Sequence, residues 1–299
     1  MSKKIVLLGG GHGLSNICGA FKNDDVSIIV SSSDDGGHTG KIRDEFGCVA
    51  LGDLRMVLSE LVDDPFLNYR FKKLHDVNNV SLGNLMLLSL FDKYDNVDLM
   101  LDDIKKIFKI KPNIYLSTSN PVILHALCED GSVIDHERII GESNAKIENL
   151  FVDKSFCNEK MIEKILEADL IVLCPGSLYT SIGSVLCVDD IKKAIQKSSA
   201  KIMYICNIMT QNGETLGFNA CDHVEVLEKI MDKKIDKVII NKEKIPLFLL
   251  NKYIKENSEP VSVDNLDDDR FEFHNMLDLK GGNVRHSSKI VREIIFNQA

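Results

Sequence analysis

Six short apolar runs recur along the chain, and they restrict its fold more than any other feature. Each run is rich in Ile, Val or Leu and shows little alternation between apolar and polar side chains. Strands with one solvated face alternate, whereas strands buried on both faces do not. The runs therefore predict a mostly parallel sheet covered by helices. They are residues 5–8, 26–30, 114–116, 170–174, 202–205 and 238–240.

Segments with helical spacing lie between these runs. Residues 158–168 and 221–231 each place their apolar side chains near one helix face. Alternating strands and helices imply βαβ units, and thus a doubly wound, Rossmann-like α/β fold with helices on both faces of the sheet. Around residues 121–140, an Asp-Gly turn separates two apolar stretches and predicts a small antiparallel hairpin. We expect one nucleotide-binding domain over residues 1–299, with this hairpin as an insertion.

Composition excludes several functional classes. The 299 residues are 44% hydrophobic and carry a formal net charge of -9, which disfavours binding to nucleic acids or anionic membranes. A small anionic ligand is compatible with this charge, because helix amides act locally. The eight cysteines form no C-x-x-C pair, which indicates reduced thiols in a cytoplasmic protein. No stretch approaches the roughly 20 apolar residues of a membrane span.

Two glycine-containing turns follow predicted strands at the same edge of the sheet. Glycines permit close approach to a ligand, and the helix that follows each turn offers amides to a phosphate. The full dinucleotide fingerprint is absent, because Leu14 and Asn16 stand where it requires glycine or alanine. The structural alternative for the first of these turns is a tight connection between strand and helix that binds no ligand. The candidate ligand-binding residues are Gly10, Gly11, His12 and Gly13 in the first turn, and Gly176, Ser177, Thr180 and Ser181 in the second.

Polar residues after other strands add candidates. Asp34 and Asp35 follow the second run, where carboxylates hold a divalent cation, bind sugar hydroxyls or activate a hydroxyl as general base. Helix capping is the structural alternative for this pair. Asp53 serves either a ligand or the N-cap of the next helix, and Asn84 opens a further helix as a possible donor. Asn207 follows the fifth run and either reads a nucleobase edge or caps the strand.

The ordered set of motifs resembles the gluconeogenesis factor family of bacteria, which is related to the 2-phospho-L-lactate transferases. The resemblance implies a nucleotide sugar such as UDP-N-acetylglucosamine or UDP-glucose as ligand, with Tyr253 and Arg285 as further contacts. It also implies a role in cell shape and envelope synthesis during gluconeogenic growth. The motif segments are residues 9–15, 34–37, 52–55, 82–84, 175–181, 206–211, 213–215, 222–225 and 285–286.

Three functions follow from these observations. The main hypothesis is a nucleotide-sugar-binding regulatory protein that requires no cofactor. The alternative is a phospholactyl-type transferase acting on a nucleotide-diphosphate donor, with Asp34 and Asp35 as catalytic residues or Mg²⁺ ligands. The third is an NAD(P)-dependent oxidoreductase, based on the glycine-rich turn and the acidic Asp34 about 20 residues later. The expected partner is a small-molecule nucleotide ligand, with a homodimer and a cell-envelope protein as further candidates.

Overall fold

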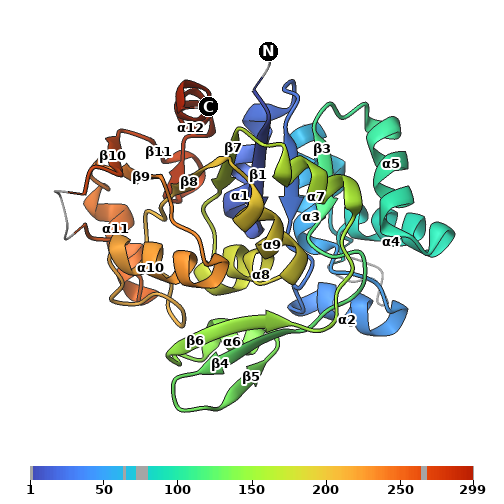
Figure 1. Cartoon of the computed structure of the whole chain (residues 1–299), viewed down its shortest axis with the longest axis horizontal. Coiled ribbons are helices and arrows are strands. Elements are labelled where there is room, and N and C mark those ends of the chain that lie inside the picture. The colour runs from blue at the N-terminus through green and yellow to red at the C-terminus, as the bar shows by residue number, and fades with distance from the viewer. Residues whose placement is uncertain (1–2, 63–64, 72–79, 264–267, 299) are drawn as a thin grey trace.

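The computed structural model describes residues 3–62, 65–71, 80–263 and 268–298. Within these residues, the centre is a seven-stranded sheet in the order β10-β9-β8-β7-β1-β2-β3, and all neighbouring strands are parallel (Figure 1). The doubly wound, Rossmann-like fold and all six predicted strands are confirmed. These six are β1 (Ile5–Gly9), β2 (Ser27–Val30), β3 (Asn113–Leu116), β7 (Leu170–Leu173), β8 (Lys201–Ile205) and β9 (Lys237–Asn241). The seventh strand, β10 (Phe271–His274), was not predicted.

Burial on both faces explains why the strands are continuously apolar. In β1, Ile5 and Leu7 belong to the hydrophobic core on one side of the sheet, whereas Val6 and Leu8 belong to the core on the other side. None of these four side chains is more than 2% exposed. Successive side chains of a strand point to opposite faces, so a strand between two cores needs an apolar residue at every position.

Helices cover both faces. The core that contains Ile5 is completed by α1 (Gly11–Cys18), α3 (Gly52–Val62), α4 (Leu82–Tyr94), α5 (Val97–Phe108) and α12 (Ser288–Gln298). The opposite core is completed by α7 (Glu159–Leu166), α8 (Ser184–Leu186), α9 (Asp189–Lys197) and α10 (Ala220–Met231). Across the described residues, no helix has the length and apolarity needed to span a bilayer. Other elements are α2 (Gly37–Phe46), α11 (Leu247–Lys255), the short 3-10 helices η1 (Gly19–Phe21), η2 (Pro65–Asn68) and η4 (Lys280–Gly282), and the strand pair β11 (Leu277–Asp278) and β12 (Arg285–His286).

The predicted hairpin is present, but it is part of a larger insertion. Strands β4 (Leu124–Cys128) and β5 (Val133–Asp135) pair antiparallel around the Asp-Gly turn, where Gly131 has a φ of 82°. A third strand, β6 (Ile147–Val152), pairs with β4, so the insertion continues beyond residue 140 and includes helix α6 (Glu137–Glu142). Strand β6 was not predicted because its sequence has no regular apolar pattern: Leu150 is buried in the core, whereas Phe151 is 41% exposed. Figure 1 shows this small sheet at the bottom of the view.

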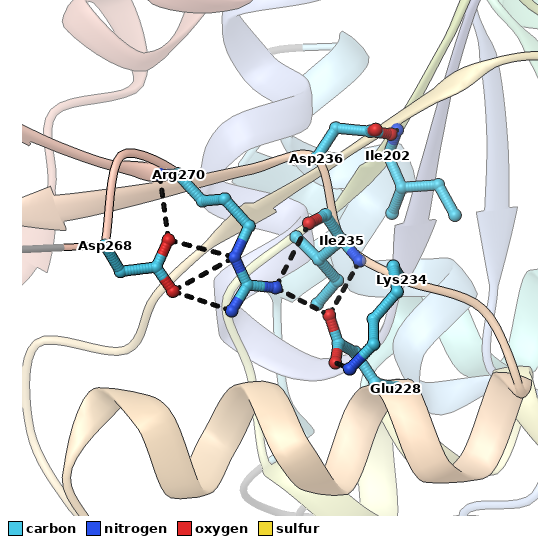
Figure 2. Close-up of polar contacts among 7 residues, drawn as sticks. All are labelled: Ile202, Glu228, Lys234, Ile235, Asp236, Asp268 and Arg270. Carbon is cyan, nitrogen blue, oxygen red and sulfur yellow. Dashed lines mark hydrogen bonds and ion pairs between the residues drawn. The ribbon is translucent and has the colours of Figure 1, made fainter. Parts of the chain in front are cut away.

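The edge strand β10 is held by a polar network that sequence periodicity does not reveal (Figure 2). The Glu228 carboxylate on α10 accepts hydrogen bonds from Arg270 Nη1 at 2.8 Å, the Ile235 amide at 2.9 Å and Lys234 Nζ at 2.6 Å. Arg270 also donates to both carboxylate oxygens of Asp268. The network joins α10, the turn before β9 and the residue that precedes β10.

We expect Glu228→Gln to lower the free energy of unfolding by about 1–3 kcal/mol, because three donors lose their charged acceptor. Urea denaturation would measure the change. Asp189→Asn is the matched control, since its side chain is 83% exposed and 3.9 Å from Lys193, and it should change stability by less than about 0.5 kcal/mol. Equal effects of the two substitutions would show that the network contributes no more than an exposed ion pair.

Candidate functional site

The order of the strands reverses between β1 and β7. From β1 the chain adds β2 and β3 on one side, and after the insertion it resumes at β7 and adds β8, β9 and β10 on the other side. Ligands of doubly wound sheets bind at the carboxyl ends of the strands where the order reverses. The segments that follow β1 and β7 are the two predicted turns, residues 9–13 and 175–181.

These two turns pack directly against each other. A Cβ added to Gly13 would lie 1.9 Å from the carbonyl oxygen of Pro175, so only glycine permits this approach. The Gly176 amide donates to Asn207 Oδ1 at 3.1 Å, and Asn207 Nδ2 donates to the Gly176 carbonyl at 2.8 Å. The second turn is therefore held between the start of α1 and the segment after β8. The side-chain amide of Asn207 was predicted either to read a nucleobase edge or to cap the strand. In the structure it positions this turn.

A cavity of about 320 Å³ opens between the turns. The residues described as lining it include no Asp, Glu, Lys or Arg, so an anion there would meet amides, hydroxyls and helix dipoles. Eight predicted site residues line the cavity: Gly11, His12, Gly13, Gly176, Ser177, Ser181, Asn207 and Tyr253. The other lining residues are Pro175, Ile208, Met209, Gln211, Val284 and His286.

The electrostatic field at His12 favours negative charge. Burial lowers the pKa of His12, and the positive charges of Arg285 and Arg55 lower it further. His12 is therefore neutral at pH 7, and the same two guanidinium groups would attract an anionic ligand. Arg285 itself is exposed on β12 and lies outside the cavity lining. Tyr253 lines the cavity, and its hydroxyl oxygen accepts a hydrogen bond from the Val284 amide at 2.9 Å.

The side chain of Glu214 accepts hydrogen bonds from the start of the helical segment that follows Gly176. The amide of Tyr179 donates to Glu214 Oε2 at 2.9 Å, and the Thr180 hydroxyl donates to Oε1 at 2.5 Å. This turn is η3 (Leu178–Gly183), a π-helical segment. Burial raises the pKa of Glu214, which is only 7% exposed. Thr180, a predicted ligand residue, is thus engaged by an internal carboxyl group and does not line the cavity.

Asp53 is not the N-cap of α3. The helix begins at Gly52, which places Asp53 in its first turn, and Asp53 Oδ2 accepts a hydrogen bond from the Gly11 amide at 2.7 Å. The interaction with the glycine turn takes the place of local capping because α1, which begins at Gly11, packs against α3. Burial and the nearby charge of Asp34 raise the pKa of Asp53 to about 7. Gly10 packs beside this carboxylate, where an added Cβ would lie 2.5 Å from Asp53 Oδ2.

Further carboxyl groups surround Asp53. Asp34 Oδ1 accepts from the Gly36 amide at 2.9 Å, and burial raises the pKa of Asp34. Asp35 contacts His136 Nδ1 at 2.8 Å and accepts from the Arg138 amide at 3.1 Å. The two predicted carboxylates thus have different environments, because Asp35 joins the loop after β2 to the insertion.

The sequence analysis missed Glu137, which α6 brings to the same group of carboxylates. Its Oε2 accepts from the Ser33 hydroxyl at 2.9 Å. Burial raises the pKa of Glu137 well above its ordinary value, and the charges of Asp34 and Asp53 raise it further. No local pattern marks this residue, because its proximity to Asp34 exists only after the insertion has folded against the sheet edge.

Two further observations complete the site. Among the described residues, no group of three or more His, Cys, Asp or Glu side chains is arranged to hold a metal ion. Asn84 lies in the first turn of α4, is 6% exposed and does not line the cavity. The predicted residues therefore divide into a neutral cavity on the β7 and β8 side and a group of carboxylates on the β2 and α3 side.

Comparisons with known proteins identify the family of this chain. The profile of the family described as 2-phospho-L-lactate transferase CofD matches residues 5–277. The chain belongs to the CofD family. Two relatives named gluconeogenesis factor, from Bacillus subtilis and Halalkalibacterium halodurans, are 37% identical over 271 residues and 36% identical over 275 residues. These alignments cover 87% and 88% of this chain, and 86% and 84% of the relatives.

The fold of this chain is also seen in a solved structure. The crystal structure of a UPF0052 family protein from Bacillus halodurans matches with a TM-score of 0.92 at 31% identity, covering 98% of this chain and 99% of that chain. The resemblance inferred from the motifs is therefore confirmed. If this CofD family member is an enzyme, its family indicates a transferase.

We expect Gly13→Ala to destabilise the protein by about 1–3 kcal/mol, because the new methyl group forces the two turns apart. Thermal and urea unfolding would measure the loss. Gly19→Ala, at the other end of α1, is the control: Gly19 has φ -55° and ψ -30°, and an added Cβ would lie 3.4 Å from its nearest neighbour. That substitution should be neutral or slightly stabilising. A Gly13→Ala protein as stable as the control would contradict the close approach.

Asp53 should make the protein less stable as the pH rises from 4 to 7. The unfolded chain loses the Asp53 proton near its ordinary pKa, whereas the folded protein keeps it until about pH 7, so ionisation favours unfolding in this range. Asp53→Asn removes this effect. The free energy of unfolding of the variant, relative to that of the wild type, should therefore be higher at pH 8 than at pH 4. Urea denaturation at both pH values tests this, and an unchanged difference would contradict the raised pKa.

Proposed function

We propose that this protein is a transferase of the 2-phospho-L-lactate transferase type, which moves a group from a nucleotide-diphosphate donor to a hydroxyl acceptor. One observation carries the proposal: the turns after β1 and β7 share a cavity, and the Asp53 carboxylate binds an amide of the first turn. A phosphate-binding surface next to several carboxyl groups has the parts that phosphoryl transfer needs. Membership of the CofD family supports the same reaction class.

In this proposal, the diphosphate of the donor lies against the first turn of α1. The first amides of a helix lack intrahelical acceptors and favour an anion. His12 and Gly13 bring such amides to the cavity, and Ser177 and Ser181 add hydroxyl donors from the facing turn. The binding free energy would come from dipoles and hydrogen bonds, because the residues described as lining the cavity include no lysine or arginine.

Asp34 is the residue that we propose as general base. Burial and the charge of Asp35 raise its pKa, which makes its carboxylate a stronger base near neutral pH. The acceptor oxygen would bond to the phosphorus remote from the nucleoside while the bridging P–O bond breaks. The nucleoside monophosphate leaves, and the acceptor proton passes to Asp34. Both carboxylates accept hydrogen bonds, Asp34 from the Gly36 amide and the Thr39 side chain and Asp35 from the Arg138 amide. Asp35 is less suited to the role because it also contacts the ring nitrogen Nδ1 of His136, which ties it to the insertion.

Mg²⁺, which the resemblance implies, is the alternative to the base role at Asp34, because a carboxylate that holds a cation has a lowered pKa and does not accept the proton. The charge of Asp34 raises the pKa of both Asp53 and Glu137, and a cation at Asp34 would relieve this repulsion. Mg²⁺ commonly takes one or two protein carboxylates and completes its shell with phosphate oxygens and water, so it needs no cage of three side chains. When bound, the ion would offset charge that develops on the transferred phosphoryl group.

A nucleotide-sugar-binding regulator without turnover is the second candidate. It is favoured by the cavity lining, whose described residues include no carboxylate or lysine that would act on a bound ligand. In this case UDP-N-acetylglucosamine or UDP-glucose would occupy the cavity beside Tyr253. The protein would then relay nucleotide-sugar supply to cell shape and envelope synthesis through a protein partner. No observation in the described residues favours the NAD(P)-dependent alternative.

We expect Asp34→Asn to reduce product formation at least about 100-fold, since general base catalysis commonly contributes this much. Nucleotide binding should change little, because Asp34 does not line the cavity. A screen of nucleotide-diphosphate donors and hydroxyl acceptors with Mg²⁺ would identify the reaction, and calorimetry would measure binding. Asp189→Asn, far along the chain in α9, is the control for a lost carboxylate.

The same experiments separate the two candidates. Absence of wild-type turnover across the screen, together with tight binding of UDP-N-acetylglucosamine, would reject the transferase and favour the regulator. Absence of binding by any nucleotide at millimolar concentration would reject both, because even weak sites register at that concentration.

A further inference from the structure

A second cavity, of about 540 Å³, lies between the insertion and α10. This volume is within the ordinary range of small-molecule sites. The insertion contributes its hairpin turn and the start of β6, and the central domain contributes η3, the turn at residues 213–218 and one face of α10. The two parts pack closely, because a Cβ added to Gly213 would lie 2.0 Å from the Gly141 carbonyl oxygen of α6. The cavity therefore forms only when the insertion has folded against the domain.

The charges around the second cavity favour a cation. Lys146 lies at its rim, since its side chain is 83% exposed and its Nζ is 3.9 Å from the carboxylate of Glu129. Glu214 lies deeper and is only 7% exposed. Carboxyl groups outnumber lysines two to one in the described lining, and a cavity lined by one sign of charge attracts the other. These charged residues are Glu129, Glu214, Asp222, Glu225, Lys146 and Lys229.

Tyr179 presents a hydroxyl to the second cavity. It lines the cavity although it is only 4% exposed. Burial and the charges of three lining carboxyl groups raise its pKa to about 12, and these groups are Glu214, Asp222 and Glu129. Among the described residues, the backbone amide of Tyr179 binds Glu214, but no hydrogen bond involves its hydroxyl. A buried hydroxyl normally has a partner, so this oxygen is free to accept a hydrogen bond from a ligand.

The remaining lining suits an organic cation better than a metal ion. Tyr179 and Phe218 supply aromatic faces, which attract ammonium groups and also pack on apolar ones. Across the described part of the chain, no group of three or more His, Cys, Asp or Glu side chains is arranged to hold a metal. Aliphatic side chains complete the wall, namely Ile147, Leu216 and Val226.

One turn separates the second cavity from the cavity between the glycine turns, which is the donor cavity of the proposed function. Gln211 lines the donor cavity and accepts a hydrogen bond from the Ser177 hydroxyl at 2.7 Å. Three residues later, Glu214 lines the second cavity and binds the Tyr179 amide and the Thr180 hydroxyl at the start of η3. An ammonium group beside Glu214 would stabilise its ionised form and strengthen both hydrogen bonds.

We propose that the second cavity binds a small molecule that carries an ammonium group on an apolar or aromatic body, and that this molecule is an effector of the donor cavity. The ammonium group donates to the Tyr179 hydroxyl and is attracted by the carboxyl groups, while its body packs on Phe218. Binding in the second cavity is independent of the proposed function, whereas the effector role rests on it.

Calorimetric titration with four probes at equal ionic strength tests the ligand class. Phenethylamine should bind at least about tenfold more tightly than phenethyl alcohol, which has the same body without the charge, because hydrogen bonds to charged groups are the stronger ones. 3-Phenylpropionate should not bind, since carboxyl groups repel it. Methylamine should bind at least about tenfold more weakly than phenethylamine, because it lacks the apolar body. Alcohol, acid or methylamine binding as tight as that of phenethylamine would overturn the proposal.

Variants locate the amine. Tyr179→Phe removes only the hydroxyl and should weaken phenethylamine binding at least about tenfold. Glu129→Gln should weaken it by about threefold, since Glu129 is near the rim and partly screened. Glu148→Gln is the matched control: Glu148 follows the lining residue Ile147 on β6, points to the other face of the strand and does not line the cavity. Urea unfolding would confirm that the variants are folded. Amine binding that Tyr179→Phe leaves unchanged would overturn the proposal.

Nucleotide titrations test the effector role. Saturating phenethylamine should tighten the binding of GDP or UDP by the wild type at least about threefold. Thr180→Val keeps the shape of the side chain but not its hydrogen bond to Glu214, and it should abolish this effect. An unchanged nucleotide affinity in the wild type would reject the effector role.

Ser177→Ala distinguishes the two cavities. It removes a hydroxyl that lines the donor cavity and should leave phenethylamine binding intact. Amine binding that is lost in Ser177→Ala and kept in Tyr179→Phe would place the amine in the donor cavity and overturn the proposal. If neither nucleotide binds the wild type but amine binding still depends on Tyr179, the proposed function fails and the second cavity stands as a binding site.

Discussion

The close approach of Gly13 to Pro175 is the contact on which the candidate site depends. Strands β1 and β7 are neighbours in the sheet although more than half of the chain lies between them, and the turns that follow them leave the same edge. With no side chain at Gly13, the two turns come together and leave a cavity between them. Asn207 holds the second turn from the side of β8 through two hydrogen bonds to Gly176.

The charge distribution around these turns is uneven in a way that the net charge of -9 conceals. The described cavity lining is neutral, and the guanidinium groups of Arg55 and Arg285 make its surroundings more positive. On the other side of the glycine turn, burial raises the pKa of Asp34, Asp53 and Glu137. The positive surroundings of the cavity and the carboxyl groups therefore lie on different sides of the glycine turn, as the proposed phosphoryl transfer would require.

The insertion contributes to this site although it lies outside the central sheet. Helix α6 supplies Glu137, and His136 and the Arg138 amide engage Asp35. A hydroxyl network continues from Glu137 through Ser33 and Ser31 to Ser184 on the far side of β1. These contacts link the insertion to the loop after β2 and to the segment after β7. A displacement of the insertion would therefore alter hydrogen bonds on both sides of the site.

The sequence by itself determined six of the seven strands of the central sheet, their parallel arrangement and the edge at which the glycine turns emerge. It did so because burial on both faces demands continuous apolar runs, and a strand followed by a glycine turn and a helix is a local signal. It also determined the family, through the order of its motifs. Only the tertiary structure decided that Asp53 binds the Gly11 amide rather than capping α3, that Thr180 serves Glu214, and that Glu137 joins Asp34. Those outcomes depend on which distant side chains the fold brings together. The pKa of a carboxyl group is set by these neighbours and by burial rather than by its position in the chain.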